Sequence, residues 1–317
     1  MKPSGIGGQA VMEGVMMKNA DKYAVAVRKA DQTIEVSTNE FQSIIKNKNI
    51  SKIPIVRGVF NFIDSMVLGM KSLTFSASFF EEEEVKPSKA DKLIEKIFKD
   101  KAEKFVMSLT VCFSIVIAVA LFMLLPYYIS SLFKNMFLSD MAIAAIEGVL
   151  RLVIFMGYIF LISFMKDIQR VFMYHGAEHK CINCIEHGLE LNVENVRKSS
   201  KQHKRCGTSF LLIVIVISII FFLFIRVDSP VLRVLVRILL IPVIAGVSYE
   251  FIRLAGRSEN KIIEILSKPG LWLQNLTTRE PDDDMIEVAI ASVEAVFDWR
   301  AYIEDDTKEK DAQPITE

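Results

Sequence analysis

Four long apolar runs, separated by shorter polar segments, occupy the middle of the chain. A helix needs ~20 apolar residues to cross the hydrocarbon core of a bilayer, and each run comes near that length. We therefore predict a mainly α protein, a polytopic membrane helical bundle with about four spans. The predicted spans are Phe105–Leu125, Ala142–Met165, Thr208–Ile225 and Val231–Ala255.

The second predicted span contains two charged residues. Glu147 and Arg151 are four residues apart and therefore share one face of a helix. Charges inside a bilayer are costly unless they pair or face a cavity. We expect an ion pair that fixes helix packing, and a substrate or proton path is the alternative.

The N-terminal segment 1–52 is rich in glycine at its start and alternates in polarity later. Within 22–41, Tyr23, Val25 and Val27 alternate with small or charged residues, which is typical of strands. This predicts a small β-containing element.

Residues 53–104 read as amphipathic and basic helices. Between residues 53 and 80, polar positions such as Arg57 and Asn61 recur at helical spacing, opposite an apolar face. Such a helix either lies in the membrane interface or packs against the bundle.

The C-terminal segment 257–303 is predicted to be helical. One helix starts near Asn260 and ends at Lys268-Pro269-Gly270, and an amphipathic helix follows the acidic residues from Asp282. The polar tail 304–317 is predicted to be disordered. The chain thus divides into 1–52, 53–104, a first membrane helix pair 105–165, a Cys/His connection 166–207, a second membrane helix pair 208–256, 257–303 and 304–317.

Cations assign sides to the loops. They are dense before the first span and in the 166–207 connection, whereas Lys134 is the only cation between Leu125 and Ala142. The positive-inside rule therefore places both termini and the Cys/His connection in the cytoplasm. Thiols stay reduced there, which favours metal binding over disulfides.

Composition supports the lipid bilayer as the main partner. Hydrophobic residues make up 51% of the chain, and the formal net charge is zero. Because there is no basic bias, we expect no nucleic-acid binding.

Metal-binding residue types are concentrated in one stretch. All 4 histidines, and all but one of the 4 cysteines, fall between residues 175 and 206. Imidazole and thiolate groups suit a divalent metal, with zinc the first choice. The candidate ligands are His175, His179, Cys181, Cys184, His203 and Cys206.

His175-x-x-Glu178-His179 matches the inverted zincin pattern. Two histidines four residues apart on a helix can share one ion, and Glu178 is then the candidate catalytic base. Such a site needs a third ligand, for which His203 or Cys206 are candidates and Glu250 is a weak one.

The cysteines do not fit the same arrangement. On a continuous helix, Cys181 and Cys184 point more than ~130° away from His179. Three alternatives follow: an ion held by the histidine pair, a helix break near Lys180 that allows a structural Cys₃His site, or no metal at all. The ligands of the structural site would be Cys181, Cys184, His203 and Cys206.

The glycine-rich start fits G-x-G-x-x-A between Gly5 and Ala10. No strand can precede it there, so we exclude a dinucleotide site. Glu13 is expected to be a solvent-exposed turn carboxylate, with a metal contact as the alternative.

Several long motifs together resemble one known family. They are Gly7-Gly-Gln-Ala-Val-Met-Glu-Gly-Val-Met-Met17, Pro54-Ile-Val-Arg-Gly58, Tyr174-His-Gly-Ala-Glu-His-Lys180, His203-Lys-Arg-Cys-Gly-Thr-Ser-Phe210, Ser248-Tyr-Glu250 and Pro269-Gly-Leu-Trp-Leu-Gln-Asn-Leu-Thr-Thr-Arg-Glu-Pro281. On these motifs the chain resembles the YqhQ family of bacterial multi-pass membrane proteins over nearly its whole length. The resemblance implies a bacterial cell (inner) membrane and the family's label of predicted metal-dependent enzyme.

Two functions remain open at this stage. One is a metal-dependent hydrolase at the cytoplasmic face, with Glu178 as its base. The other is a non-catalytic scaffold or assembly factor that binds other membrane proteins and uses the Cys/His cluster structurally. A transporter ranks third, because four spans leave little room for a transport path.

Overall fold

The computed structural model describes residues 3–47, 49–80, 102–135, 139–225, 227, 229–258 and 260–311. The chain forms two compact units. Unit 1 comprises residues 1–80, 159–218 and 226–317, and unit 2 comprises residues 81–158 and 219–225.

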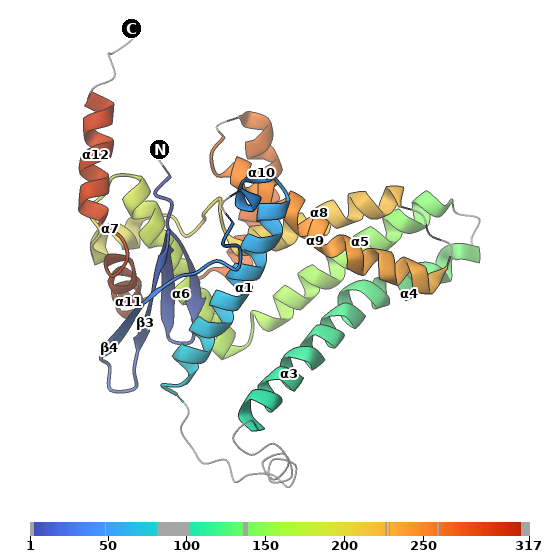
Figure 1. Cartoon of the computed structure of the whole chain (residues 1–317), viewed down its shortest axis with the longest axis horizontal. Coiled ribbons are helices and arrows are strands. Elements are labelled where there is room, and N and C mark those ends of the chain that lie inside the picture. Colours follow the sequence, from blue (N-terminus) through green and yellow to red (C-terminus); the bar gives the residue numbers. More distant parts are fainter. Residues whose placement is uncertain are drawn as a thin grey trace. The chain divides into compact units, whose positions relative to one another are not determined.

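Unit 1 contains a four-stranded antiparallel sheet in which each strand pairs with the next one along the chain (Figure 1). The predicted N-terminal β element is therefore confirmed. Gly14 is needed at the start of the second strand, because a Cβ there would lie 2.2 Å from the Ala26 carbonyl oxygen. The strands are β1 (Gly7–Val11), β2 (Gly14–Asn19), β3 (Lys22–Arg28) and β4 (Ile34–Glu40).

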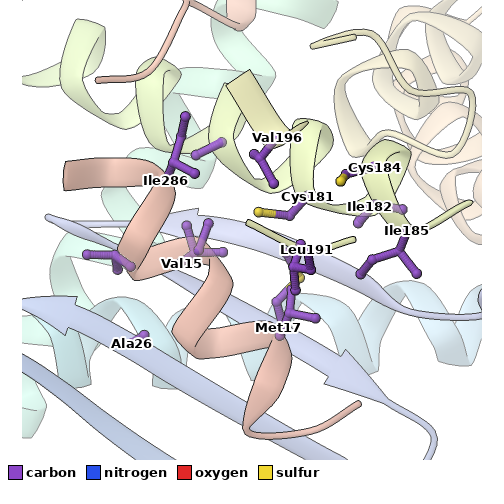
Figure 2. Packing of buried hydrophobic residues seen from close by; sticks show 14 of the residues in the cluster. Val15, Met17, Ala26, Cys181, Ile182, Cys184, Ile185, Leu191, Val196 and Ile286 are labelled. Carbon is purple, nitrogen blue, oxygen red and sulfur yellow. The ribbon is translucent and has the colours of Figure 1, made fainter. Parts of the chain in front are cut away.

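One face of the sheet is covered by α6 (Lys166–Glu186) and α11 (Asp283–Glu294). Val15 and Met17 of β2 point into this layer and pack with Ile286 of α11 (Figure 2). Successive residues of a strand face opposite sides of the sheet, so Met16, between Val15 and Met17, points away from this core.

The other face of the sheet packs against α1 (Val56–Ala77). Leu68 of this helix joins a second buried cluster with Val25 and Val27 of β3. The central strands are thus buried on both sides, and they carry apolar or small residues at consecutive positions.

Helix α1 also packs against α9 (Pro230–Ala255). The two backbones meet at glycines, and a Cβ on Gly58 would lie 2.8 Å from the Gly246 carbonyl oxygen. Beside this contact, Arg57 binds both carboxylate oxygens of Glu250. Of the two alternatives for this helix, packing is therefore the one observed for its first turns.

Among the residues that the structure describes, four helices are long and apolar enough to cross a membrane, so the predicted fold class is confirmed. Large side chains such as Phe113, Leu161 and Leu239 are exposed on them, which fits contact with lipid. The candidate spans consist of α3 (Ala102–Val119) continued by a π-helical turn (Ala120–Leu124) and α4 (Leu125–Ser131), then α5 (Asp140–Ile162), α8 (Gly207–Phe224) and α9.

The predicted ion pair inside unit 2 is present. Arg151 and Glu147 lie 2.8 Å apart, and both are buried. The Nε of Arg151 also donates to the Phe122 carbonyl oxygen at 3.0 Å. Phe122 belongs to the π-helical turn, so the guanidinium also serves a carbonyl where the regular helix is interrupted.

Two C-terminal boundaries differ from the sequence prediction. Helix α10 (Lys261–Thr277) does not end at Pro269, because a proline removes one helical hydrogen bond while tertiary contacts hold the turns beyond it. Helix α12 (Trp299–Asp311) extends into the segment predicted to be disordered. The remaining short helices that the structure describes are η1 (Ile50–Lys52), η4 (Leu132–Asn135) and α7 (Val193–Lys198). The basic helix predicted before the first span falls largely within residues 81–101, which lie outside the described residues.

Replacement of Gly176 by alanine tests the packing of α6. A Cβ at this position would lie 2.0 Å from the Arg279 carbonyl oxygen, and a backbone atom cannot move away cheaply. We expect Gly176→Ala to lower the free energy of unfolding by about 1–3 kcal/mol, despite alanine's higher helix propensity. Thermal unfolding of the purified protein in detergent measures the change.

Gly157→Ala is the matched control, because Gly157 is also helical and a Cβ there meets no atom within 4 Å. It should leave stability unchanged or raise it by up to about 1 kcal/mol. Equal stability of the two variants would contradict the close contact at Gly176.

Candidate metal centre

Helix α6 carries the histidine motif and continues without a break to Glu186. Tyr174, Ala177 and Cys181 recur at steps of three and four and face the sheet core. The polar side of the helix therefore presents His175 and His179 together, away from the sheet.

The structure brings three of the candidate ligands together. One ligand atom each from His175, His179 and Cys206 lie within 4.8 Å of one another, the only such group found among the described residues. The His175 Nε2 is 3.3 Å from the Cys206 Sγ, and the ring centroids of His175 and His179 are 4.4 Å apart. His179 and Cys206 are buried, and His175 is nearly so.

Both imidazoles are oriented by backbone carbonyls. The Nδ1 of His175 lies 2.9 Å from the Thr277 carbonyl oxygen, and the Nδ1 of His179 lies 2.6 Å from that of Lys201. A carbonyl can only accept, so each Nδ1 carries a proton, which leaves Nε2 as the ring nitrogen that can bind a metal once it is deprotonated. Histidines that bind metals are commonly held in this way.

Cys206 lies directly before the first residue of α8. The backbone N–H of Thr208 donates to its Sγ at 3.3 Å, as expected for a sulfur at a helix N-terminus. Burial alone would raise the pKa of Cys206, but the imidazoles of His175 and His179 bring it well below its ordinary value. The thiolate, which is the metal-binding form of cysteine, is therefore favoured here.

The charge on His175 is coupled to the same sulfur. Burial alone would lower the pKa of His175, but the Cys206 thiolate and the Glu178 carboxylate raise it to about 9. An imidazolium next to a thiolate also describes an activated cysteine nucleophile. That alternative gives no role to the second imidazole, His179, which approaches the same sulfur.

Glu178 lies at the edge of this cluster. Its carboxylate is 4.0 Å from the His175 Nε2, and its side chain is buried. The close approach of α6 to β1 is possible because Gly8 has no side chain: a Cβ there would lie 2.8 Å from the Glu178 Cγ. The glutamate of the motif therefore faces the same space as the histidine Nε2.

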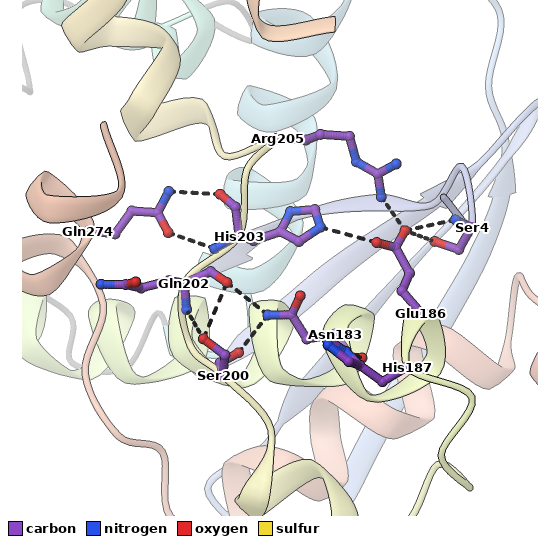
Figure 3. A network of polar contacts seen from close by, with 9 residues as sticks. All are labelled: Ser4, Asn183, Glu186, His187, Ser200, Gln202, His203, Arg205 and Gln274. Carbon is purple, nitrogen blue, oxygen red and sulfur yellow. Dashed lines mark hydrogen bonds and ion pairs between the residues drawn. The ribbon is translucent and has the colours of Figure 1, made fainter. Parts of the chain in front are cut away.

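The segment that leads to Cys206 is held by polar side chains of α6. Lys180 donates to the carbonyl oxygens of Arg197 and Ser199, each at 2.9 Å. Asn183 donates to those of Ser200 and Gln202 at 2.7 and 2.9 Å (Figure 3). These bonds fix the path of the chain between α7 and α8.

The structure does not bring Cys181 and Cys184 to this cluster. Both belong to the buried apolar cluster instead, in which Figure 2 labels them, and the Cys184 Sγ lies 3.4 Å from the Glu190 carbonyl oxygen. Burial raises the pKa of Cys181 well above its ordinary value and that of Cys184 to about 11. The break of α6 that a Cys₃His site would need near Lys180 is absent.

His203 lies near the cluster but has other contacts. Its ring is 5.6 Å from that of His179, and its Nε2 lies 3.7 Å from the Glu186 carboxylate. Gln274 of α10 binds the backbone N–H and carbonyl of His203, both at 2.8 Å (Figure 3). Glu250 is paired with Arg57 instead.

Glu186 joins three parts of unit 1 (Figure 3). Its Oε1 accepts from the Ser4 backbone N–H and hydroxyl at 2.7 and 2.8 Å and from Arg205 at 2.5 Å. Burial alone would raise the pKa of Glu186, but His203, Arg205 and Ser4 lower it to about 2.

Glu13 lies in the turn between β1 and β2, with a positive φ of 49°. Arg170 of α6 binds both of its carboxylate oxygens, and the Tyr174 hydroxyl lies 3.3 Å from one of them. Glu13 is a turn carboxylate as predicted, but it is half-buried rather than solvent-exposed, because it anchors the sheet to α6.

Comparison with known proteins identifies the family. Residues 53–299 match the family described as "Protein of unknown function (DUF1385)". The chain is 37% identical over 309 residues to "Uncharacterized protein YqhQ" of Bacillus subtilis (strain 168), and the match covers 96% of each chain. The chain belongs to this family. The predicted resemblance is confirmed, and no solved structure matches the chain.

Acid titration tests the Glu186 network. The folded-state pKa of Glu186 lies below its ordinary value of 4.5, so its contribution to stability is full above about pH 4.5 and is lost as the pH falls toward 2. At pH 7, Glu186→Gln should lower the free energy of unfolding by roughly 1–3 kcal/mol, because the half-buried donors of Ser4 and Arg205 lose a charged and buried acceptor. Unfolding curves at a series of pH values measure the difference between variant and wild type.

That difference should shrink below pH 4.5. Glu194→Gln is the control, because Glu194 forms only an exposed pair with Lys198 and should have no measurable effect. A constant difference between Glu186→Gln and wild type across this range would contradict the assigned charge state.

Proposed function

We propose that this protein is a metal-dependent hydrolase of the bacterial cell membrane, with its metal centre at the cytoplasmic face. The observation that carries the proposal is the anchoring of both histidines. Their Nδ1 atoms are bound to backbone carbonyls, so each Nε2 is the nitrogen left to bind an ion at a point shared with the Cys206 sulfur. The His175 Nε2 contacts that sulfur at 3.3 Å, and its proton would be released when an ion binds.

The donor set fits zinc. Two imidazole nitrogens and one thiolate match the borderline-soft preference of Zn²⁺, whereas Mg²⁺ and Ca²⁺ prefer oxygen ligands. Three protein ligands also leave one position open in a tetrahedral site, which is typical of catalytic rather than structural zinc. The placement of Cys181 and Cys184 in the apolar core supports this choice.

A divalent ion bound by these residues would act as a Lewis acid toward water and toward a carbonyl or phosphoryl group. Glu178 would take a proton from the attacking water and return it to the leaving group, the role of a general base and then a general acid. His175 is the residue nearest to that carboxylate, at 4.0 Å, so the base and the proposed ion share one small space.

Loop charge supports the cytoplasmic side. The connection that contains the centre is rich in lysine and arginine, including Lys180, Arg197, Lys201 and Arg205. In the bacterial cytoplasm the thiol of Cys206 would stay reduced and available as a ligand.

One observation favours a second candidate, a structural metal site in a membrane scaffold. The cluster joins three distant segments: α6, the chain before α8 and, through the Thr277 carbonyl, α10. An ion there would fasten them together without chemistry, and other membrane proteins would be the partners. Glu178 separates the candidates, because a structural site does not need a base.

Metal content tests the site itself. We expect the purified protein to hold about one zinc ion per chain, and Cys206→Ala to weaken zinc binding at least about 100-fold. His175→Ala and His179→Ala should act in the same way. Elemental analysis and competition with a chelating dye measure stoichiometry and affinity.

The matched control for these variants is Cys184→Ala, a buried thiol outside the cluster. It should retain the ion. A wild-type protein without metal, or ion loss in the control alone, would remove the proposed centre.

Glu178→Gln tests catalysis. The amide cannot accept a proton, so turnover should fall by about 100-fold or more while zinc content and unfolding temperature stay unchanged. The assay presents a panel of ester, amide and phosphoester substrates to the zinc-loaded protein in lipid nanodiscs. Glu194→Gln, on an exposed carboxylate, should keep full turnover.

Retained turnover in Glu178→Gln would contradict the role of the base. A zinc-loaded wild type that hydrolyses nothing in the panel would favour the structural site.

A further inference from the structure

Helix α10 has an apolar stripe that no described residue covers. Ile262, Ile265, Leu266 and Trp272 have exposed fractions of 54–67%, and Pro269 between them is also exposed. At 100° per residue these positions lie on one side of the helix. Glu264 and Lys268 lie outside this stripe, on the exposed polar side.

The C-terminal end of this stripe is at the level where a candidate span begins. A Cβ on Gly270 would lie 2.9 Å from the Ser209 side chain, and Ser209 belongs to the first turn of α8. Moreover, α10 begins only a few residues after α9 ends at Ala255. Two candidate spans therefore bring α10 to the boundary of the apolar layer.

The side of α10 next to the stripe contacts the candidate metal centre. The side chain of Gln274 binds the backbone of His203 and the Ser209 hydroxyl, and the Thr277 carbonyl oxygen accepts from the His175 Nδ1. Gln274 and Thr277 are buried. Thus the C-terminal turns of α10 contact the cluster, and the neighbouring side of the same helix exposes aliphatic side chains and a tryptophan.

We propose that the stripe of α10 lies in the lipid bilayer, at the boundary between headgroups and acyl chains, and so holds the centre at the membrane surface. Aliphatic residues with a tryptophan on one face and charged residues on the other are typical of interfacial helices. Lys261 and Lys268 lie beside the stripe, where they can reach lipid phosphates.

A second copy of the chain is the competing occupant. A stable dimer interface involves about 20–30 residues on each side, and the stripe offers far fewer. The stripe is continuous with two candidate spans, since α10 follows the end of α9 and contacts the start of α8. This continuity favours lipid as the occupant.

Tryptophan quenching tests the placement without the metal or an enzymatic assay. The chain has 2 tryptophans; Trp272 is exposed, and Trp299 is buried against the sheet core and donates to Glu294. In nanodiscs made with lipids brominated near the top of the acyl chains, wild-type fluorescence should fall by a large part of the Trp272 contribution. Trp272→Phe should show almost no quenching.

Moving the probe sharpens the test. In the Trp272→Phe background, Ile265→Trp should restore quenching, whereas Glu264→Trp should not, because position 264 lies on the water-facing side. Both sites are exposed, so neither substitution disturbs the core.

Equal quenching at positions 264 and 265, or none at 272 and 265, would overturn the proposal. Protection from quenching that depends on protein density in the membrane would assign the stripe to a second copy instead. Quenching is measured both with and without added zinc. If the protein binds no zinc, the quenching result still tests the placement of the stripe. If zinc binds but quenching is absent, only the placement of the stripe is overturned.

Discussion

Hydrogen bonds from α6 side chains to backbone carbonyls are the constraint on which the candidate centre depends. Between α7 and α8 the chain has no regular structure, yet the four consecutive carbonyls of residues 199–202 are bound by three residues of one helix, Lys180, Asn183 and His179. Lys180 also binds the carbonyl of Arg197, in the last turn of α7. A buried carbonyl left without a donor costs ~1–3 kcal/mol, so these bonds determine one path for the segment. That path brings Cys206 to the two histidines.

The other wall of the centre comes from the C-terminal side of the chain. The Thr277 carbonyl orients the His175 ring, and Gln274 holds the backbone of His203. From α6, Glu186 binds Arg205 and Ser4. The three candidate ligands are therefore placed by contacts that involve no metal. Preorganisation of this kind is what a tight and geometrically defined site requires.

The spans, the β-containing element and the concentration of ligands could be predicted, because each is encoded in local composition or spacing. The choice among ligands could not, since it depends on whether α6 continues past Lys180. The sequence did not predict strands β1 and β2. Strand β2 is buried on both faces, so its polar and apolar residues do not alternate, and β1 is rich in glycine. Thr277 and Lys201 left no signal, because any residue can supply a carbonyl oxygen.

The long sequence separation of these contacts has a consequence for biosynthesis. The sheet emerges from the ribosome first, yet α6 follows two candidate spans later and α11 follows all four. The apolar face that α6 and α11 later cover is therefore exposed during synthesis, while the spans are inserted. Incomplete chains with exposed apolar surface are prone to aggregate. The Thr277 carbonyl also arrives after the last span, so a truncated nascent chain cannot complete the anchoring of His175.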